Sequence, residues 1–221
     1  MSFHIHYLKV FLVLFAIIFP STLTGFFMSL QKSRIFVTAS NAITYLFLVL
    51  LGLWTGFIGE IHFPNNPIWL FIAMGMGFVC ICIEVLVGKF ILYAKNRVWI
   101  KRIEIHESAS GTCWPIDVFL ILVGAFGEEM IFRQILFYIG MDILGWPVLF
   151  VVLFSSIIYG LNHIFFSRQS VVQKVFSGIV FSMLFLLSGK SIIIAVLAHF
   201  SQNLILYTVA RSKRGEFVWK N

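Results

Sequence analysis

The sequence predicts an all-α fold, a polytopic membrane helical bundle with about seven transmembrane helices. Of its 221 residues, 60% are hydrophobic and only 11% are charged, whereas a soluble domain carries about a quarter charged residues. The mean hydropathy is +0.99. The apolar residues gather in long runs separated by polar, Gly or Pro residues, which is typical of helices that cross a bilayer. We therefore expect a single integral-membrane domain over residues 1–221.

The apolar runs define the expected helices in order. They cover about 7–30, 35–58, 68–94, 116–140, 147–166, 171–188 and 191–210. Each is long enough to cross a core of about 30 Å at a rise of about 1.5 Å per residue. The first is too long for the apolar core of a cleavable signal peptide. Residues 1–94 thus hold three helices without a motif, 95–115 form a cytoplasmic connector, and 116–210 hold the remaining helices.

The basic residues test this arrangement, because loops on the cytoplasmic side carry an excess of Lys and Arg. With seven spans, only Lys9 and Lys190 fall on the outer side, and Lys89 and Arg133 fall within spans. The cytoplasmic side receives Lys32, Arg34, Lys95, Arg97, Lys101, Arg102, Arg168, Lys174, Arg211, Lys213, Arg214 and Lys220. This asymmetry predicts an N-terminus outside and a C-terminus in the cytoplasm.

The composition also limits the partners. The isoelectric point is about 9.5, but the basic residues lie in short gaps between apolar runs, so we expect a lipid bilayer and no nucleic acid. The three cysteines, Cys80, Cys82 and Cys113, have neither the spacing of a metal site nor that of a disulfide framework. We expect them to be small apolar side chains.

Three charged residues interrupt the run 116–140. Glu128 and Glu129 are adjacent, and Arg133 follows four residues after the second. Inserting each group into hydrocarbon costs on the order of a few kcal/mol, so such groups indicate a functional site. The i,i+4 spacing predicts an ion pair between Glu129 and Arg133. Glu128 is turned about 100° away on the helix, which leaves its carboxylate available.

Polar residues in two later runs are candidate partners for Glu128. His163 lies near the cytoplasmic end of the run 147–166, and His199 and Asn203 lie in the last run. Because His199 and Asn203 are four residues apart, they share one helix face. We expect these groups to converge at a similar depth, whereas Glu84 is expected to be a bundle contact or to lie near the interface.

This set of residues predicts hydrolysis of a peptide bond. Glu128 near a histidine can act as a general base on water, and a second histidine with an amide can donate to a developing oxyanion. Taken singly, each feature has a simpler interpretation: a Glu–Arg clamp, or polar contacts between helices. Several polar groups whose insertion into the membrane is unfavourable, placed at a similar depth, favour a functional site over structural contacts.

At these residues the chain resembles the CPBP family of intramembrane proteases, which includes CAAX and bacteriocin-processing (Abi-type) proteases. Its first motif, Glu-Glu-x-x-x-Arg, matches Glu128, Glu129 and Arg133. Its second, an aromatic residue before a His, corresponds to Tyr159 and His163, with Tyr in place of the usual Phe. The third matches His199 and Asn203. The resemblance covers roughly residues 116–207.

The resemblance implies a role for each residue. Glu128 activates water held by His163, while His199 and Asn203 stabilise the oxyanion. The pair Glu129 and Arg133 supports the site, and Tyr159 supports it through its ring. No cofactor is expected, because the His-Glu-x-x-His signature is missing. Zinc bound by Glu128, His163 and His199 stays open as an alternative.

The expected protein is therefore an intramembrane endopeptidase in a bacterial cytoplasmic (inner) membrane, acting on a peptide or membrane-protein substrate. Two other functions use the same features. A proton-coupled transporter would use the buried charges as a relay, although no inverted repeat is evident. A non-catalytic immunity or scaffold protein would share the fold and need no catalysis.

Overall fold

The computed structural model describes residues 2–18, 34–97, 113–164 and 166–212, and within these ranges the chain is helical without strands. This confirms the predicted all-α class. The helices are α1 (Ser2–Ile18), α3 (Arg34–Thr55), α4 (Ile68–Asn96), α5 (Trp114–Glu129), η1 (Met130–Ile135), η2 (Tyr138–Ile143), α6 (Val148–Leu161), α7 (Arg168–Leu187) and α8 (Ile192–Ser212). Residues 19–30 of the first predicted run and most of the predicted connector 95–115 lie outside the described residues.

The three segments α5, η1 and η2 form one helical rod. Pro115 stands in the first turn of α5, where a missing N–H costs nothing. Directly after Glu129 the backbone changes to a π-helix in η1, and a second π-helical stretch follows in η2. π-helical turns are rare and occur frequently at functional sites. When this rod is counted once, the predicted runs correspond one to one with the observed helices.

The helices differ in their ability to cross a bilayer. Within the described residues, Ile68–Asn96, Arg168–Leu187 and Ile192–Arg211 are long and apolar enough to do so. His6–Ile18, Ser40–Thr55 and Val148–Leu161 are apolar but shorter. Apolar side chains such as Phe11, Trp54 and Phe71 face outward from α1, α3 and α4, as they would toward lipid. The count of seven spans and their orientation stay predictions.

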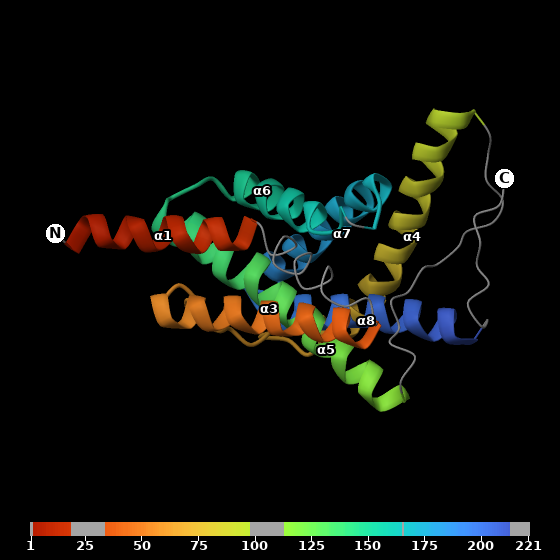
Figure 1. Ribbon diagram of the computed structural model, residues 1–221, viewed down its shortest axis with the longest axis horizontal. Coiled ribbons are helices and arrows are strands. Elements are labelled where there is room, and N and C mark those ends of the chain that lie inside the picture. The colour runs from red at the N-terminus through yellow and green to blue at the C-terminus, as the bar shows by residue number, and fades with distance from the viewer. Residues whose placement is uncertain (1, 19–33, 98–112, 165, 213–221) are drawn as a thin grey trace.

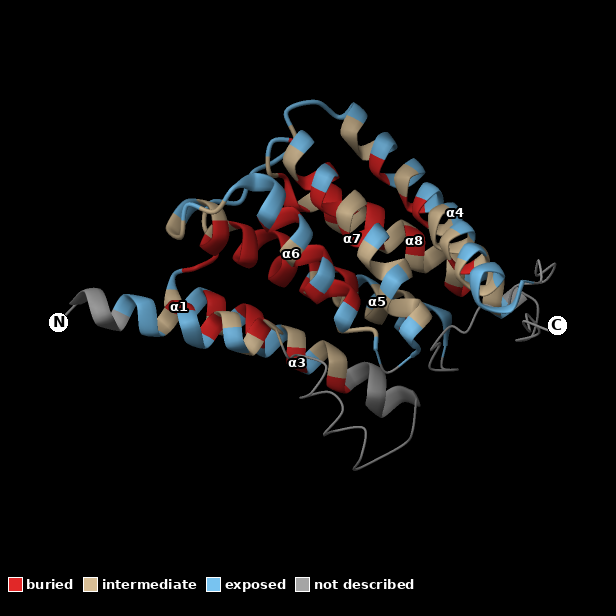
Figure 2. Cartoon of the chain, turned by 90° about the horizontal axis from the view of Figure 1, so that it is seen from above, coloured by how far each residue is buried: buried red, intermediate tan, exposed pale blue. Residues whose placement is uncertain are grey.

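The buried residues gather where the central helices meet (Figure 2). In this view α1 and α3 lie along one edge, and α4 lies along the opposite edge. Helix α6 packs on α7, α4 contacts both α7 and α8, and α5 contacts α3 and α8. Helix α8 runs along the length of the molecule and α4 crosses it steeply (Figure 1). The polar groups of α5, η1, α6 and α8 are thereby brought into one core.

A glycine permits the close approach of α4 to α8. A Cβ atom added to Gly77 would lie 2.7 Å from the carbonyl oxygen of Ala198 and 2.8 Å from the backbone nitrogen of Gln202. Only a residue without a side chain fits at such a contact, as is common where membrane helices cross. Since Ala198 precedes His199, this packing fixes the position of α8 next to the predicted site.

Candidate active site

Arg133 and Glu129 form a fully buried ion pair. Both side chains have 0% exposure, and Nη1 of Arg133 lies 3.2 Å from Oε1 of Glu129. Nη2 of Arg133 donates a second hydrogen bond of 3.0 Å to the carbonyl oxygen of Gly178 on α7. The guanidinium also lies over the rings of Tyr159, at 4.7 Å, and Phe181, at 5.5 Å. The predicted i,i+4 pair is therefore present, and it joins η1 to α6 and α7.

His199 binds the same carboxylate from α8. Its Nδ1 lies 2.8 Å from Oε1 of Glu129, the oxygen that also accepts from Arg133. The ring stacks on Phe181 with centroids 5.0 Å apart and planes inclined by 21°. Glu129 therefore holds the imidazole as well as the guanidinium, a role that the spacing along one helix did not predict.

The bond to Glu129 determines what the other nitrogen of His199 can do. A carboxylate only accepts, so Nδ1 carries the proton in this contact. Nε2 is then an acceptor when the ring is neutral and a donor when it is an imidazolium. Nε2 lies 3.9 Å from Oε2 of Glu128.

Glu128 is the less enclosed of the two glutamates, with 15% of its side chain exposed. Its Oε2 has no hydrogen-bond partner among the described residues. Tyr45 of α3 interacts with this carboxylate and packs against Gly127, where an added Cβ would lie 2.6 Å from that of Tyr45. Arg133 thus pairs with Glu129 rather than with Glu128 in the described part of the chain, and the buried Oε2 of Glu128 is left able to accept a hydrogen bond.

His163 lies in the turn that follows α6 and is half-buried. Its Nδ1 lies 3.0 Å from the carbonyl oxygen of Tyr159, and its ring contacts that of Tyr159 at 5.1 Å. It interacts electrostatically with Glu128 and His199. The hydroxyl of Tyr159, in turn, lies 3.4 Å from Nε2 of His199. Three separate helices therefore bring Glu128, His163 and His199 into one neighbourhood.

Asn203 is the predicted site residue that the structure does not connect to this group. It is half-buried on α8, and its side-chain amide makes no hydrogen bond to any residue in the described ranges. Its i,i+4 spacing places it one turn from His199 on the same helix, as predicted. Although Asn203 shares a helix face with His199, its amide makes no hydrogen bond to either glutamate.

The alternative of a bound zinc ion can be tested against the side chains present. A catalytic zinc site takes three protein ligands and a water. Among the residues that the structure describes, no three His, Cys, Asp or Glu side chains lie together closely enough to hold an ion. Glu128, His163 and His199 therefore do not form such a site in this geometry.

A second polar contact in the bundle was not predicted as a pair. Oε1 of Glu84 on α4 lies 2.8 Å from Nζ of Lys174 on α7 and accepts a hydrogen bond of 2.7 Å from Ser177. Glu84 is thus a bundle contact, one of the two interpretations open from the sequence. Lys174, which was counted on the cytoplasmic side, lies within the predicted run 171–188 and within α7, which begins at Arg168. The sequence does carry a signal for this pair, because Glu84 and Lys174 have opposite charges and each lies within an apolar run.

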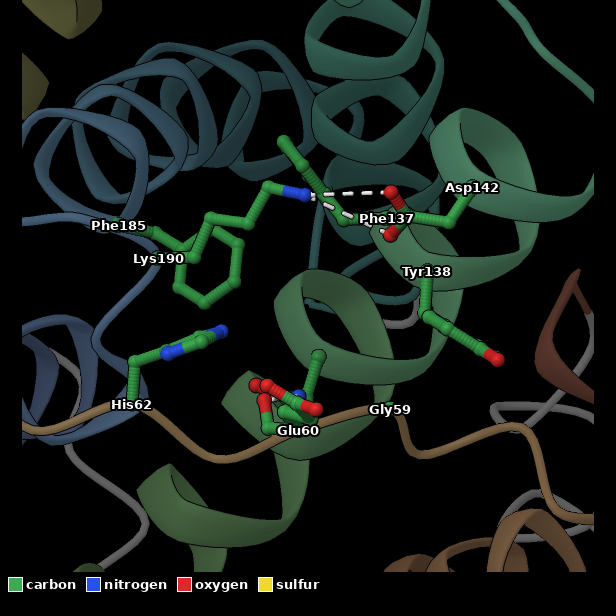
Figure 3. A pocket seen from close by; sticks show the side chains of 9 residues that line it. Gly59, Glu60, His62, Phe137, Tyr138, Asp142, Phe185 and Lys190 are labelled. Atoms are coloured by element: carbon green, nitrogen blue, oxygen red, sulfur yellow. Dashed lines mark hydrogen bonds and ion pairs between the residues drawn. The ribbon is translucent and has the colours of Figure 1, made fainter.

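A hollow of about 420 Å³ lies at the ends of the helices, apart from these residues (Figure 3). Glu60 and His62 line one part of it, and Lys190 reaches across to Asp142 at 3.3 Å. Gln134 also lines the hollow and donates to the carbonyl oxygens of Ile58 and Glu60. The hollow contains none of the predicted site residues, so it is not the candidate active site.

Comparison with known proteins agrees with the motif assignment. Residues 110–205 match the family described as type II CAAX prenyl endopeptidase Rce1-like, which confirms the predicted resemblance over a segment just under half of the chain. The matched segment contains every predicted site residue. Neither the curated proteins nor the solved structures gave a match. The family match supports a protease with a peptide or protein substrate, and the apolar helices support an integral membrane protein.

Proposed function

We propose that this protein is an intramembrane endopeptidase with Glu128 as its general base, on the strength of the match of residues 110–205 to the family described as type II CAAX prenyl endopeptidase Rce1-like. One observation carries the assignment. Oε2 of Glu128 has no partner among the described residues and lies 3.9 Å from Nε2 of His199. At this separation, one water molecule can hydrogen bond to both atoms.

The proposed reaction begins at that water. Glu128 accepts a proton from it while His163 orients it, and the resulting hydroxide attacks the carbonyl carbon of the scissile bond. The C–O bond forms as the carbonyl π electrons move to oxygen and create an oxyanion. Glu128 then returns the proton to the leaving nitrogen as the oxyanion re-forms the C=O bond and the C–N bond breaks, with its electron pair going to nitrogen. The products are a carboxylic acid and an amine, so protons and electrons balance.

The oxyanion needs donors at the moment when it forms. Nε2 of His199 donates when the ring is an imidazolium, whose Nδ1–H is held by Glu129. Asn203 would supply an amide N–H if its side chain turns toward the bound substrate. Glu129 and Arg133 keep the imidazole in position, because both of their side chains are fully buried and locked by contacts with α7 and α8.

We further propose a cytoplasmic-facing site in a bacterial cytoplasmic membrane, acting on a peptide or membrane protein near the bilayer surface. The excess of basic residues at one end of the predicted spans supports this orientation. The buried position of Glu129, Arg133 and His199 implies that a substrate must reach the site within the bundle.

The test uses the purified full-length protein in nanodiscs and a peptide library. Glu128→Gln removes the base but keeps the size of the side chain, so we expect cleavage to fall at least about a hundredfold, the lower end of general acid–base contributions. Asp142→Asn, which alters an exposed acid of the distant hollow, is the matched control and should cleave at the wild-type rate. Wild-type cleavage by Glu128→Gln would refute the base assignment.

A chelator added to the same assay distinguishes the two mechanisms. Unchanged cleavage supports water activation by the glutamate alone. Loss of cleavage that zinc restores would instead assign Glu128, His163 and His199 as metal ligands and would require these side chains to move together.

A further inference from the structure

Tyr159 occupies the centre of the buried cluster and has 0% exposure. One face of its ring receives the guanidinium of Arg133 at 4.7 Å, and its edge contacts Phe132 at 5.5 Å. These are contacts of the ring, and a phenylalanine would make them equally well. The hydroxyl is therefore the feature of this residue that the packing does not explain.

The hydroxyl has one hydrogen-bond partner among the described residues, Nε2 of His199 at 3.4 Å. This distance is longer than the usual range of about 2.5–3.2 Å for such bonds, so the contact is weak. Burying a hydroxyl is unfavourable unless it gains a good hydrogen bond. Among the described residues, this buried donor therefore has no acceptor at the distance of a strong hydrogen bond.

The geometry suggests what that acceptor is. Two donor atoms 3.4 Å apart can both reach one oxygen at about 2.8 Å. Nε2 of His199 is already the donor assigned to the oxyanion. Glu128, which interacts electrostatically with Tyr159, has accepted the proton of water by the time the oxyanion exists, so it does not compete for the hydroxyl proton as a carboxylate.

We infer that Tyr159 is a further catalytic residue, whose hydroxyl donates a hydrogen bond to the oxyanion beside Nε2 of His199. The inference rests on the proposed endopeptidase function and names a donor for it. Tyr159 is also placed better than Asn203, whose side-chain amide makes no hydrogen bond to the other described site residues. A preorganised donor of this kind contributes mainly to the rate of the chemical step.

The test compares Tyr159→Phe with the wild type on the library peptide that is cleaved fastest. The substitution removes one oxygen and keeps the ring. We expect kcat to fall about tenfold to a hundredfold with KM nearly unchanged, because the bond forms only in the transition state. A phosphinic analogue of the same peptide, which mimics the tetrahedral oxyanion, should lose affinity by a similar factor. Replacement of Tyr159 by 4-aminophenylalanine restores a donor and should recover part of kcat.

Tyr207→Phe is the matched control. Tyr207 is also buried, and its hydroxyl donates to Asp117 at 2.9 Å about two turns further along α8 than His199. This variant should keep the wild-type kcat, and both variants should keep the wild-type Tm within a few degrees.

The outcomes separate the inference from the function on which it rests. Wild-type kcat in Tyr159→Phe, while Glu128→Gln is inactive, overturns the role of Tyr159 alone. A loss in Tyr159→Phe that appears in KM and Tm, with unchanged affinity for the phosphinic analogue, also overturns it and assigns a structural role. Wild-type cleavage by Glu128→Gln overturns the proposed function itself.

Discussion

Removing Arg133 should destabilise this protein more than removing any exposed cation. Arg133→Ala deletes the 3.2 Å ion pair with Glu129 and the 3.0 Å hydrogen bond to Gly178. It also deletes the guanidinium contacts with two aromatic rings. The carboxylate of Glu129 then stays buried at 0% exposure, with His199 as its remaining partner among the described residues.

The size of the effect follows from that burial. Breaking a buried ion pair by deleting one member costs about 3–5 kcal/mol, because the other charge is left uncompensated. Lys190 and Asp142 supply the comparison within the same chain. Their pair has nearly the same 3.3 Å distance, but the side chains are 38% and 45% exposed. An exposed pair contributes about 0–1 kcal/mol, so Arg133→Ala should exceed Lys190→Ala by at least about 2 kcal/mol.

Equilibrium unfolding in mixed micelles, followed by the fluorescence of the six Trp residues, measures both variants. Arg133→Lys adds an intermediate point, since it keeps the charge but loses the planar fork that reaches two acceptors. The order of stability should be wild type, then Arg133→Lys, then Arg133→Ala. If Arg133→Ala and Lys190→Ala cost the same free energy of unfolding, the buried network does not hold η1 to α7 as described.

Further predictions concern catalysis, packing and orientation. Glu129→Gln should lower kcat about a hundredfold or more with little change in KM, because the amide can turn its NH₂ toward His199 and favour the wrong tautomer; an unchanged rate would show that the bond at 2.8 Å is dispensable. In a double-mutant cycle, Glu84→Gln and Lys174→Met should couple by about 0.5–3 kcal/mol in unfolding, as contacting charges do, and additive effects would contradict a direct contact. Cys113, which is exposed, should react with a membrane-impermeant maleimide only when the cytoplasmic face is accessible, and labelling of intact cells would reverse the predicted orientation.

Contacts between residues close together in the sequence were predictable, whereas contacts between residues on different helices were not. The pair Glu129–Arg133 was predictable because four residues on one helix set the two side chains close together. Which glutamate receives His199 depends instead on how α8 packs against α5, because His199 and Glu129 are 70 residues apart in the sequence. For this reason the sequence does not indicate that Glu129 holds the imidazole. The same reason applies to Asn203, which shares a helix face with His199 but whose role at the site stays a prediction.

The composition of the buried cluster argues against a purely structural purpose. Apolar residues of similar volume commonly stabilise a core as well as a buried ion pair does, or better, so stability alone gives little reason to keep Glu129, Arg133 and His199 together. A network in which every polar atom has a hydrogen-bond partner could still hold the helices together rigidly. In this network, some polar atoms have no such partner. Glu128 Oε2, Glu129 Oε2 and Arg133 Nε lack hydrogen-bond partners among the described residues. The unpaired oxygen of Glu128 lies on the side of His199 and Tyr159, where the proposed reaction places its water and its oxyanion. The Glu128 oxygen without a hydrogen-bond partner thus lies where a hydrolase needs an acceptor for its water. A purely structural network would gain no stability from an unpaired oxygen at this position.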